Sequence, residues 1–236
     1  MRFLPVNLDT LLVELNDLEQ TLALFDALSA EPLAGVEEII PAARTLLIQF
    51  RPSAITRQTL VDQLARRDAS QRRAVEQRRV EIPVHYNGED LDEVAALLQI
   101  SREEVIRRHT AEDYSVAFCG FAPGFGYLTG GAGFQVPRRK TPRTRIPAGA
   151  VALAGEFSGI YPKASPGGWQ IIGVTPLQMW DLERAEPALL RPGYKVRFVD
   201  AGPLPASGLP APAAPAAALP PSGAYLQILS PGLHSV

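Results

Sequence analysis

The strongest chemical signal in the sequence is a basic loop that runs from residue 137 to residue 147. The loop carries five cationic side chains and no carboxylate: Arg138, Arg139, Lys140, Arg143 and Arg145. Its three prolines favour an extended backbone and exclude the loop from the centre of a sheet. Arginine forks match the geometry of carboxylates and phosphates. The loop therefore predicts the cationic edge of an anion-binding pocket, with a solvated surface loop as the alternative.

A second signal is the aromatic segment from residue 118 to residue 128, which reads Phe-Cys-Gly-Phe-Ala-Pro-Gly-Phe-Gly-Tyr-Leu. Pro123 and Gly124 predict a tight turn, because proline fixes φ at the first corner of a type I or type II turn and glycine accepts the positive φ that type II needs at the second. Four rings flank this turn: Phe118, Phe121, Phe125 and Tyr127. So much aromatic area either covers a core or lines a pocket.

The titratable candidate is His109, which is followed closely by Glu112 and Asp113. A histidine beside a carboxylate can act as a general acid or base. The alternative is a histidine that interacts favourably with the C-terminal dipole of a helix. Cys119 lies in an apolar strand, which favours burial. Three scattered histidines and one cysteine offer no zinc spacing, and no G-x-x-x-x-G-K-[ST] motif is present.

Composition narrows the class of protein. The chain of 236 residues is 46% hydrophobic and 20% charged, as is ordinary for a globular protein. Its net charge of −2 argues against binding to nucleic acid. No apolar run approaches the roughly 18 residues of a membrane span. The lone cysteine and the lack of a signal-peptide pattern predict a cytoplasmic protein.

Apolar runs and helical leucine spacing predict a small α+β domain in residues 1–80. Strands are expected at 10–15, 36–40, 45–50 and 80–84, and helices at 18–28 and 55–67. Asn16 or Asp17 is the expected cap of the first helix, and Ser53 that of the second. The order β-α-β-β-α-β is that of a ferredoxin-like split βαβ domain with a four-stranded antiparallel sheet.

Residues 81–200 predict a helical hairpin followed by a β-barrel. Helices are expected at 90–100 and 101–109, with Ser101 and Glu104 forming a capping box. The pair also resembles a DNA-binding helix-turn-helix, but Glu103 and Glu104 would face phosphates, so packing on the barrel is favoured. Pro-Gly corners at 123–124, 166–167 and 192–193 then alternate with apolar runs at 151–154, 170–174 and 195–199, which is typical of a barrel or sandwich.

Two other stretches predict little packed structure. Six arginines between residues 66 and 79 are interrupted by acids, which indicates a solvated helix end. Residues 201–223 are rich in proline and alanine and predict a semi-rigid linker. Residues 224–236 contain another strand-like run, so a further domain is expected to follow.

Six motifs together resemble the family of 5-oxoprolinase B subunits, also called allophanate hydrolase subunit 1, which includes the KipI inhibitor of a sporulation histidine kinase. The resemblance covers residues 8–200. The motifs are His109…Asp113-Tyr114, Phe118-x-Gly120-Phe121-x-Pro123-Gly124-Phe125-x-Tyr127-Leu128, Pro137-Arg138-Arg139-x-x-Pro142-Arg143, Pro147-Ala148-Gly149-x-Val151, Gly159-x-Tyr161-Pro162 and Pro166-Gly167-Gly168-Trp169-Gln170-x-Ile172-Gly173.

The resemblance implies a cyclophilin-like β-barrel and a role in an ATP-dependent 5-oxoprolinase, which opens 5-oxoproline to L-glutamate together with the A and C subunits. ATP is expected in the complex but not on a P-loop of this chain, and the chain alone is expected to be inactive. The alternatives are a histidine-kinase inhibitor of the KipI type and a part of a urea- or allophanate-type carboxyltransferase. Residues 226–232 resemble the opening of the C subunit (allophanate hydrolase subunit 2), so a shortened B–C fusion or a vestigial extension is expected.

The resemblance also implies roles for site residues. Nine residues are expected to bind the substrate: Phe121, Phe125, Tyr127, Arg138, Arg139, Arg143, Tyr161, Trp169 and Gln170. The three arginines would hold the substrate carboxylate or a phosphorylated intermediate, and the aromatic rings would exclude water. His109 and Asp113 are expected to form a catalytic pair that handles a proton.

Overall fold

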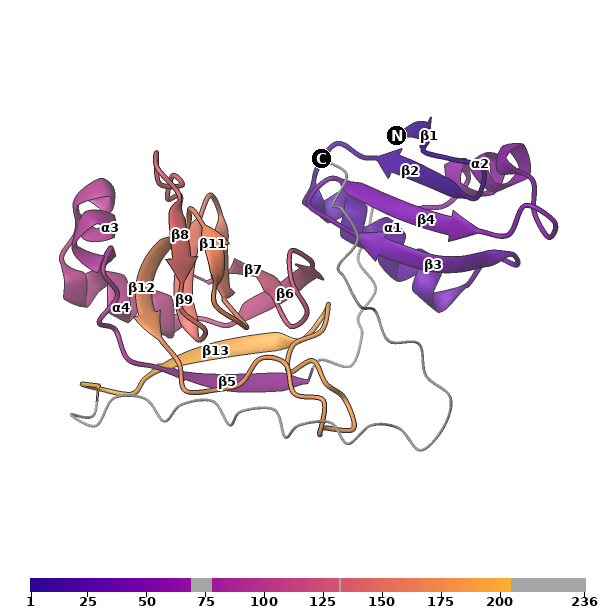
Figure 1. Ribbon diagram of the computed structural model, residues 1–236. Helices are drawn as coiled ribbons and strands as arrows, with labels where there is room; N and C mark the ends of the chain where they lie inside the picture. The colour runs from indigo at the N-terminus through magenta and orange to yellow at the C-terminus, as the bar shows by residue number, and fades with distance from the viewer. Residues whose placement is uncertain (69–77, 132, 205–236) are drawn as a thin grey trace.

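The computed structural model describes residues 1–68, 78–131 and 133–204 (Figure 1). Most of the expected linker and the whole segment 224–236 lie outside the described residues, as does the middle of the arginine-rich stretch between residues 66 and 79. The described helices include none that is long and apolar enough to cross a membrane.

The N-terminal part is a four-stranded antiparallel sheet covered by two helices. Its elements are β1 (Arg2–Pro5), β2 (Thr10–Glu14), α1 (Leu18–Ala30), β3 (Val36–Pro41), β4 (Thr45–Phe50) and α2 (Arg57–Ala65). The strand order is β1-β2-β4-β3. Alternate side chains of β2 and β4, such as Leu11, Val13 and Ile48, share one buried cluster with Leu24 of α1 and Leu60 of α2. Both helices therefore cover the same face of the sheet.

Each of these helices begins at a side chain that caps its free amides. The Asp17 carboxylate accepts a hydrogen bond from the amide of Gln20, as predicted for the first helix. The predicted cap of the second helix is wrong, because Thr56 and not Ser53 accepts from the amide of Thr59. Residues 51–55 form a hydrogen-bonded turn of their own, which delays the start of α2.

The predicted fourth strand of this sheet is also wrong. β5 (Arg79–Val84) forms where a strand was expected, but it pairs in parallel with β13 (Lys195–Asp200) in the other sheet, and the two run side by side in Figure 1. Ile82 and Val84 of β5 are fully buried in one cluster with Val196 and Phe198 of β13. The edge beside β2 is occupied by β1 instead, which was not predicted.

The second part is a seven-stranded, barrel-like sheet in the order β12-β9-β10-β7-β6-β13-β5. Its other strands are β6 (Tyr114–Cys119), β7 (Gly126–Gly130), β9 (Ala150–Ala154), β10 (Phe157–Ile160) and β12 (Gln170–Val174). The two edges meet where His85, next to β5, exchanges two backbone hydrogen bonds of 2.8 and 2.9 Å with Val174 of β12. This bridge nearly closes the sheet. A short two-stranded sheet joins β8 (Arg143–Ile146) and β11 (Ser165–Gly167).

The predicted helical hairpin packs on the barrel. α3 (Leu91–Leu98) contacts β12 and α4 (Arg102–Ala111) contacts β13. Ser101 caps α4 by accepting from the amide of Glu104. Val105 and His109 of α4 are fully buried, so this face of the helix serves the core of the barrel rather than a DNA groove.

Two of the predicted Pro-Gly corners are confirmed and one is wrong. Gly124 and Gly193 have φ of +85° and +88°, with hydrogen bonds across both turns. Gly167 instead belongs to β11. A Cβ at Gly167 would lie 2.4 Å from the hydroxyl oxygen of Tyr161, so glycine is needed there for space and not for a turn.

The two parts touch where α1 packs on the barrel. Leu22 of α1 shares a small buried cluster with Ala117 and Phe118 of β6. The aromatic segment of the barrel therefore begins under the N-terminal part, and Tyr127 after its turn packs against the same cluster.

His109 is a buried core histidine that joins four segments of the barrel. Its Nδ1 lies 2.7 Å from the Tyr86 hydroxyl, its Nε2 lies 3.0 Å from Ser158 Oγ, and its ring stacks on Phe198 with centroids 4.2 Å apart. Asp113 instead pairs with Arg197 at 2.6 Å. The structure does not pair His109 with Asp113, because both ring nitrogens already have partners in the core. The catalytic role of the two residues stays a prediction that this geometry does not support.

We predict that this histidine makes the fold sensitive to acid. Burial lowers the pKa of His109 from its ordinary 6.5 to about 3. Unfolding exposes the ring to water, where its pKa returns to the ordinary value. At a pH between the two pKa values, the unfolded chain therefore binds a proton at His109 and the folded chain does not. The free energy of unfolding should then be intact above pH 6.5 and should fall with pH by up to about 1.4 kcal/mol per unit from this group.

Urea unfolding at several pH values between 7.5 and 4.5 measures this slope. In His109→Gln, which retains polar atoms toward Tyr86 and Ser158, the slope should become shallower by that amount. An unchanged slope in the variant would assign the acid sensitivity to other groups.

Candidate functional site

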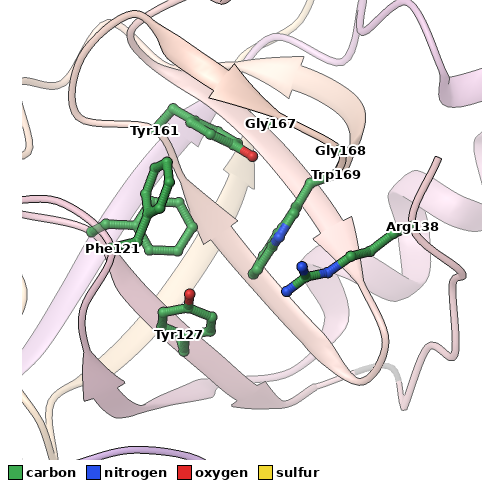
Figure 2. A pocket seen from close by; sticks show the side chains of 8 residues that line it. Phe121, Tyr127, Arg138, Tyr161, Gly167, Gly168 and Trp169 are labelled. Carbon is green, nitrogen blue, oxygen red and sulfur yellow. The ribbon is translucent and has the colours of Figure 1, made fainter. Parts of the chain in front are cut away.

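A small pocket opens on the barrel beside the aromatic turn (Figure 2). Its volume is about 120 Å³. Eight residues line it: Phe121, Phe125, Tyr127, Arg138, Tyr161, Gly167, Gly168 and Trp169. They come from the turn between β6 and β7, from β7 itself, from the basic loop, and from β11 and the segments that flank it. The structure thus brings together six of the nine residues predicted to bind substrate.

The walls of the pocket are aromatic rings packed edge to face. Phe125 contacts both Tyr161 and Trp169 with ring centroids 5.3 Å apart, and Tyr127 contacts Trp169 at 5.6 Å. Phe125, Tyr161 and Trp169 are buried. Such T-shaped packing of buried rings holds each ring in place, so the walls are formed before any ligand arrives.

Tyr161 presents a hydroxyl group to this pocket, as Figure 2 shows. Burial raises the pKa of Tyr161 to about 12, while a hydrogen bond from the Trp169 backbone and the charge of Arg138 act in the opposite direction. At neutral pH the hydroxyl therefore keeps its proton and can donate a hydrogen bond to a ligand. Gly167 allows the close approach of this hydroxyl to the β11 backbone.

Arg138 is the cation of the pocket. Its guanidinium points toward Trp169 in Figure 2 and makes no ion pair or hydrogen bond with the described part of the chain. No carboxylate lies among the lining residues. A guanidinium against aromatic walls, without a counter-charge, is suited to a small anion such as a carboxylate.

Phe121 stands at the mouth of the pocket in a strained backbone conformation. Its φ is +68°, a region that costs a bulky residue about 1–3 kcal/mol. Its ring is 59% exposed and meets Phe125 and Tyr161 edge to face at 5.3 and 6.0 Å. The fold therefore holds an apolar ring partly in water at a cost in backbone energy, which indicates a ligand-facing role.

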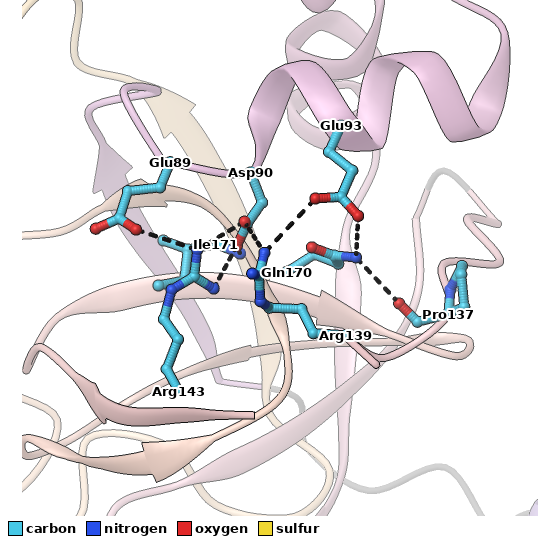
Figure 3. A network of polar contacts seen from close by, with 8 residues as sticks. All are labelled: Glu89, Asp90, Glu93, Pro137, Arg139, Arg143, Gln170 and Ile171. Atoms are coloured by element: carbon cyan, nitrogen blue, oxygen red, sulfur yellow. Dashed lines mark hydrogen bonds and ion pairs between the residues drawn. The ribbon is translucent and has the colours of Figure 1, made fainter. Parts of the chain in front are cut away.

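Arg139 and Arg143 do not line this pocket, so their role as substrate-binding residues stays a prediction that this geometry does not support. Both bind the buried carboxylate of Asp90 at the start of α3 (Figure 3). Arg143 donates two hydrogen bonds to Asp90, of 2.7 and 2.8 Å, and a third to Glu89 at 3.1 Å. The hydrogen bonding to Asp90 is the largest cause that raises the pKa of Arg143. These two arginines hold the loop to the helix.

Gln170 is also placed outside the pocket lining. Its side-chain amide donates to Glu93 Oε1 at 3.4 Å and to the Pro137 carbonyl oxygen at 3.5 Å (Figure 3). Its role as a substrate ligand stays a prediction that this geometry does not support. His109 and Asp113 are likewise absent from the lining residues.

Sequence reasoning missed Asp90, Gly167 and Gly168 as members of this region. In the sequence, Asp90 indicates only the start of a helix, and the two glycines after Pro166 indicate only a turn. No local pattern shows that the missing side chain of Gly167 makes room for the Tyr161 hydroxyl.

Comparison with known proteins defines first the class of this fold and site. Residues 1–190 match the family described as "Carboxyltransferase domain, subdomain C and D". The solved structure of TTHA0988 is 39% identical with a TM-score of 0.68, and the match covers 83% of this chain but only 42% of that one. The Kluyveromyces lactis urea amidolyase shares the fold, with a TM-score of 0.69 over 85% of this chain and 15% of its own, at 19% identity.

Curated relatives then narrow the class. The chain is 41% identical over 185 residues to the B subunit of 5-oxoprolinase from Bacillus subtilis, which covers 72% of this chain and 77% of the relative. It is 42% identical over 173 residues to the Escherichia coli O157:H7 protein of the same name, which covers 71% and 79%. This chain therefore belongs to the family of 5-oxoprolinase B subunits, as the motifs predicted.

We predict that two arginines of the basic loop contribute differently to stability. Arg143→Ala removes two bonds to a carboxylate that is only 3% exposed, and should lower the free energy of unfolding by about 1–3 kcal/mol. Arg138→Ala removes no such bond and should change it by no more than about 0.5 kcal/mol. Urea unfolding of both variants checks the contrast. Equal stability of the two would show that Asp90 does not depend on Arg143.

A second contrast separates the two phenylalanines of the turn. Phe121→Asn places a residue that tolerates positive φ at a half-exposed site, so the free energy of unfolding should stay within about 1 kcal/mol of the wild type. Phe125→Ala empties a site that is 1% exposed and should cost about 3–5 kcal/mol. Thermal and urea unfolding measure both. A large loss in Phe121→Asn would make Phe121 a structural residue.

Proposed function

We propose that this chain is the B component of an ATP-dependent 5-oxoprolinase, which adds water across the ring amide of 5-oxoproline to give L-glutamate. One observation carries the proposal: an arginine without a counter-charge among the described residues lies in a small, preformed aromatic pocket. The family membership supports the substrate. The chain spans about three quarters of its curated relatives but only 42% of TTHA0988, so the activity of the whole assembly is part of the proposal.

The chemistry of the substrate matches the lining residues. 5-Oxoproline has one carboxylate, a five-membered ring with two apolar methylene groups, and an amide carbonyl. Arg138 would bind the carboxylate, and the rings of Phe121, Phe125 and Trp169 would cover the methylenes and exclude water. The protonated Tyr161 hydroxyl would donate to an oxygen of the substrate. A volume of about 120 Å³ suits such a molecule, since pockets for drug-sized ligands reach roughly 300–1,000 Å³.

The pocket does not fit ATP. Its volume is far below that of sites for larger ligands, its lining includes a single cation, Arg138, and the sequence has no P-loop. We therefore place the nucleotide, which supplies the energy for ring opening, on a partner. The partners proposed are the A and C subunits. The cytoplasm as location and a cyclophilin-like class for the barrel belong to the same proposal.

An inhibitory binding module of the KipI type is the second candidate, and the exposed apolar side chains of the barrel favour it. Phe121, Trp180 and Leu182 are large hydrophobic residues with substantial exposure. A partner protein such as the helices of a histidine kinase could bury them. The likeness to urea amidolyase at 19% identity shows the fold alone and adds no carboxyltransferase activity to this chain.

Reconstitution tests the proposed function. The pure chain should not turn over 5-oxoproline, whereas a mixture with the A and C subunits should do so in the presence of ATP. Arg138→Ala should lower the kcat/KM of the mixture at least tenfold, because the substrate loses a charged hydrogen bond of about 1.5–3 kcal/mol. The matched control is Arg145→Ala, which removes an exposed arginine from the same loop and should leave turnover unchanged.

Two outcomes would contradict the proposal. Turnover that does not depend on this chain would remove it from the enzyme, and full activity of Arg138→Ala would remove the pocket from the reaction. Inhibition of a histidine kinase by the chain without any 5-oxoproline turnover in the mixture would favour the second candidate.

A further inference from the structure

We propose that Asp90 is a positioning residue for the pocket: its carboxylate fixes the two backbone segments that present Arg138 and Trp169. The identity of the ligand in this inference rests on the proposed function, but the positioning itself does not. Asp90 is outside the pocket lining and 2% exposed, so it acts on a ligand only through its neighbours.

The first segment held by Asp90 is the basic loop. Arg139 Nη1 donates to Asp90 Oδ1 at 2.5 Å, and Arg143 donates to both carboxylate oxygens (Figure 3). The backbone amide of Arg139 also donates to the Gly168 carbonyl oxygen at 2.8 Å. Arg139 is therefore held by both its side chain and its main chain. Because Arg138 immediately precedes Arg139, this limits the positions that the Arg138 guanidinium can reach.

The second segment is the start of β12. The amide of Ile171, two residues after Trp169, donates to Asp90 Oδ2 at 2.7 Å. The Asp90 amide in turn donates to the Ile171 carbonyl oxygen at 3.0 Å. The approach is close, since a Cβ on Gly88 would lie 2.3 Å from that same oxygen. One carboxylate therefore joins the strand that follows the tryptophan to the loop that carries the free arginine.

The start of α3 shows that this carboxylate is not used for the helix itself. Asp90 is the N-cap residue of α3, yet its side chain makes no capping hydrogen bond. Capping by an aspartate contributes about 1 kcal/mol, and the fold forgoes it. The carboxylate instead accepts from Arg139, Arg143 and Ile171, which belong to the segments behind the pocket walls. This arrangement is the one expected of a positioning residue.

A double-mutant cycle tests the inference. The full chain is used in a Trp180→Phe background, so that Trp169 is the one remaining tryptophan and its emission reports the pocket. The dissociation constant of 5-oxoproline is measured for the wild type, Asp90→Asn, Arg138→Ala and the double variant. Each single variant should bind at least tenfold more weakly, and the double variant should be no more than about twofold weaker than Arg138→Ala, because both act through one guanidinium.

A matched control removes the same charge one residue away. Glu89→Gln takes a carboxylate from Arg143 but leaves the Asp90 contacts in place, and Glu89 is 73% exposed. Its affinity for 5-oxoproline should match the wild type. If Asp90→Asn does not fold, Arg143→Lys replaces it, since lysine keeps the charge but cannot form the two-pronged contact. Losses that add in the double variant would overturn the inference and leave Asp90 with a role in stability alone.

A readout without substrate separates this inference from the proposed function. Iodide, an anion, and acrylamide, a neutral quencher, are compared on Trp169. Arg138 beside the indole should favour iodide, and the iodide-to-acrylamide quenching ratio should fall in Asp90→Asn to the value of Arg138→Ala. If the quenching ratio falls in this way but 5-oxoproline does not bind, the proposed substrate is rejected and the positioning role of Asp90 is retained. A ratio in Asp90→Asn equal to that of Glu89→Gln would reject the positioning role.

Discussion

The structure of the site depends on one buried carboxylate that must be surrounded by donors. An isolated buried charge costs several kcal/mol, so Asp90 requires the two guanidinium groups and the backbone amide that bind it. Those donors lie on the basic loop and on β12, which are distant in sequence from α3. Neutralising Asp90 therefore draws three segments together, and two of them lead directly to Arg138 and Trp169, which line the pocket.

The aromatic pocket shows a similar division between support and function. Phe125 and Trp169 are buried and hold one another edge to face, so they stabilise the barrel as well as line the cavity. Phe121 is half exposed on a backbone of positive φ, and Arg138 has no partner among the described residues. The groups that gain least from the fold are those that a ligand would contact, and backbone strain such as that at Phe121 typically gathers at functional sites.

Membership of the 5-oxoprolinase family accounts for the architecture but leaves individual roles to the geometry. The urea amidolyase shares this fold at 19% identity, and a shared fold does not by itself assign a chemistry. Within this chain the geometry distinguishes three arginines of the basic loop. Arg138 faces the pocket, whereas Arg139 and Arg143 hold the loop to Asp90. It also turns His109 from a catalytic candidate into a core residue with a lowered pKa.

The sequence by itself determined most elements, the tight turn at Pro123-Gly124 and most of the residues from which the site is built. These depend on local φ preferences, capping and periodicity, which act over a few residues. Only the tertiary structure decided that β5 pairs with β13, because both sheets could bury its apolar face. The tertiary structure also decided the different roles of Arg138 and Arg139. Adjacent residues on an extended chain point to opposite sides, so only one of the two can face the pocket. The distant Asp90 binds Arg139 and thereby leaves Arg138 on the side of the pocket.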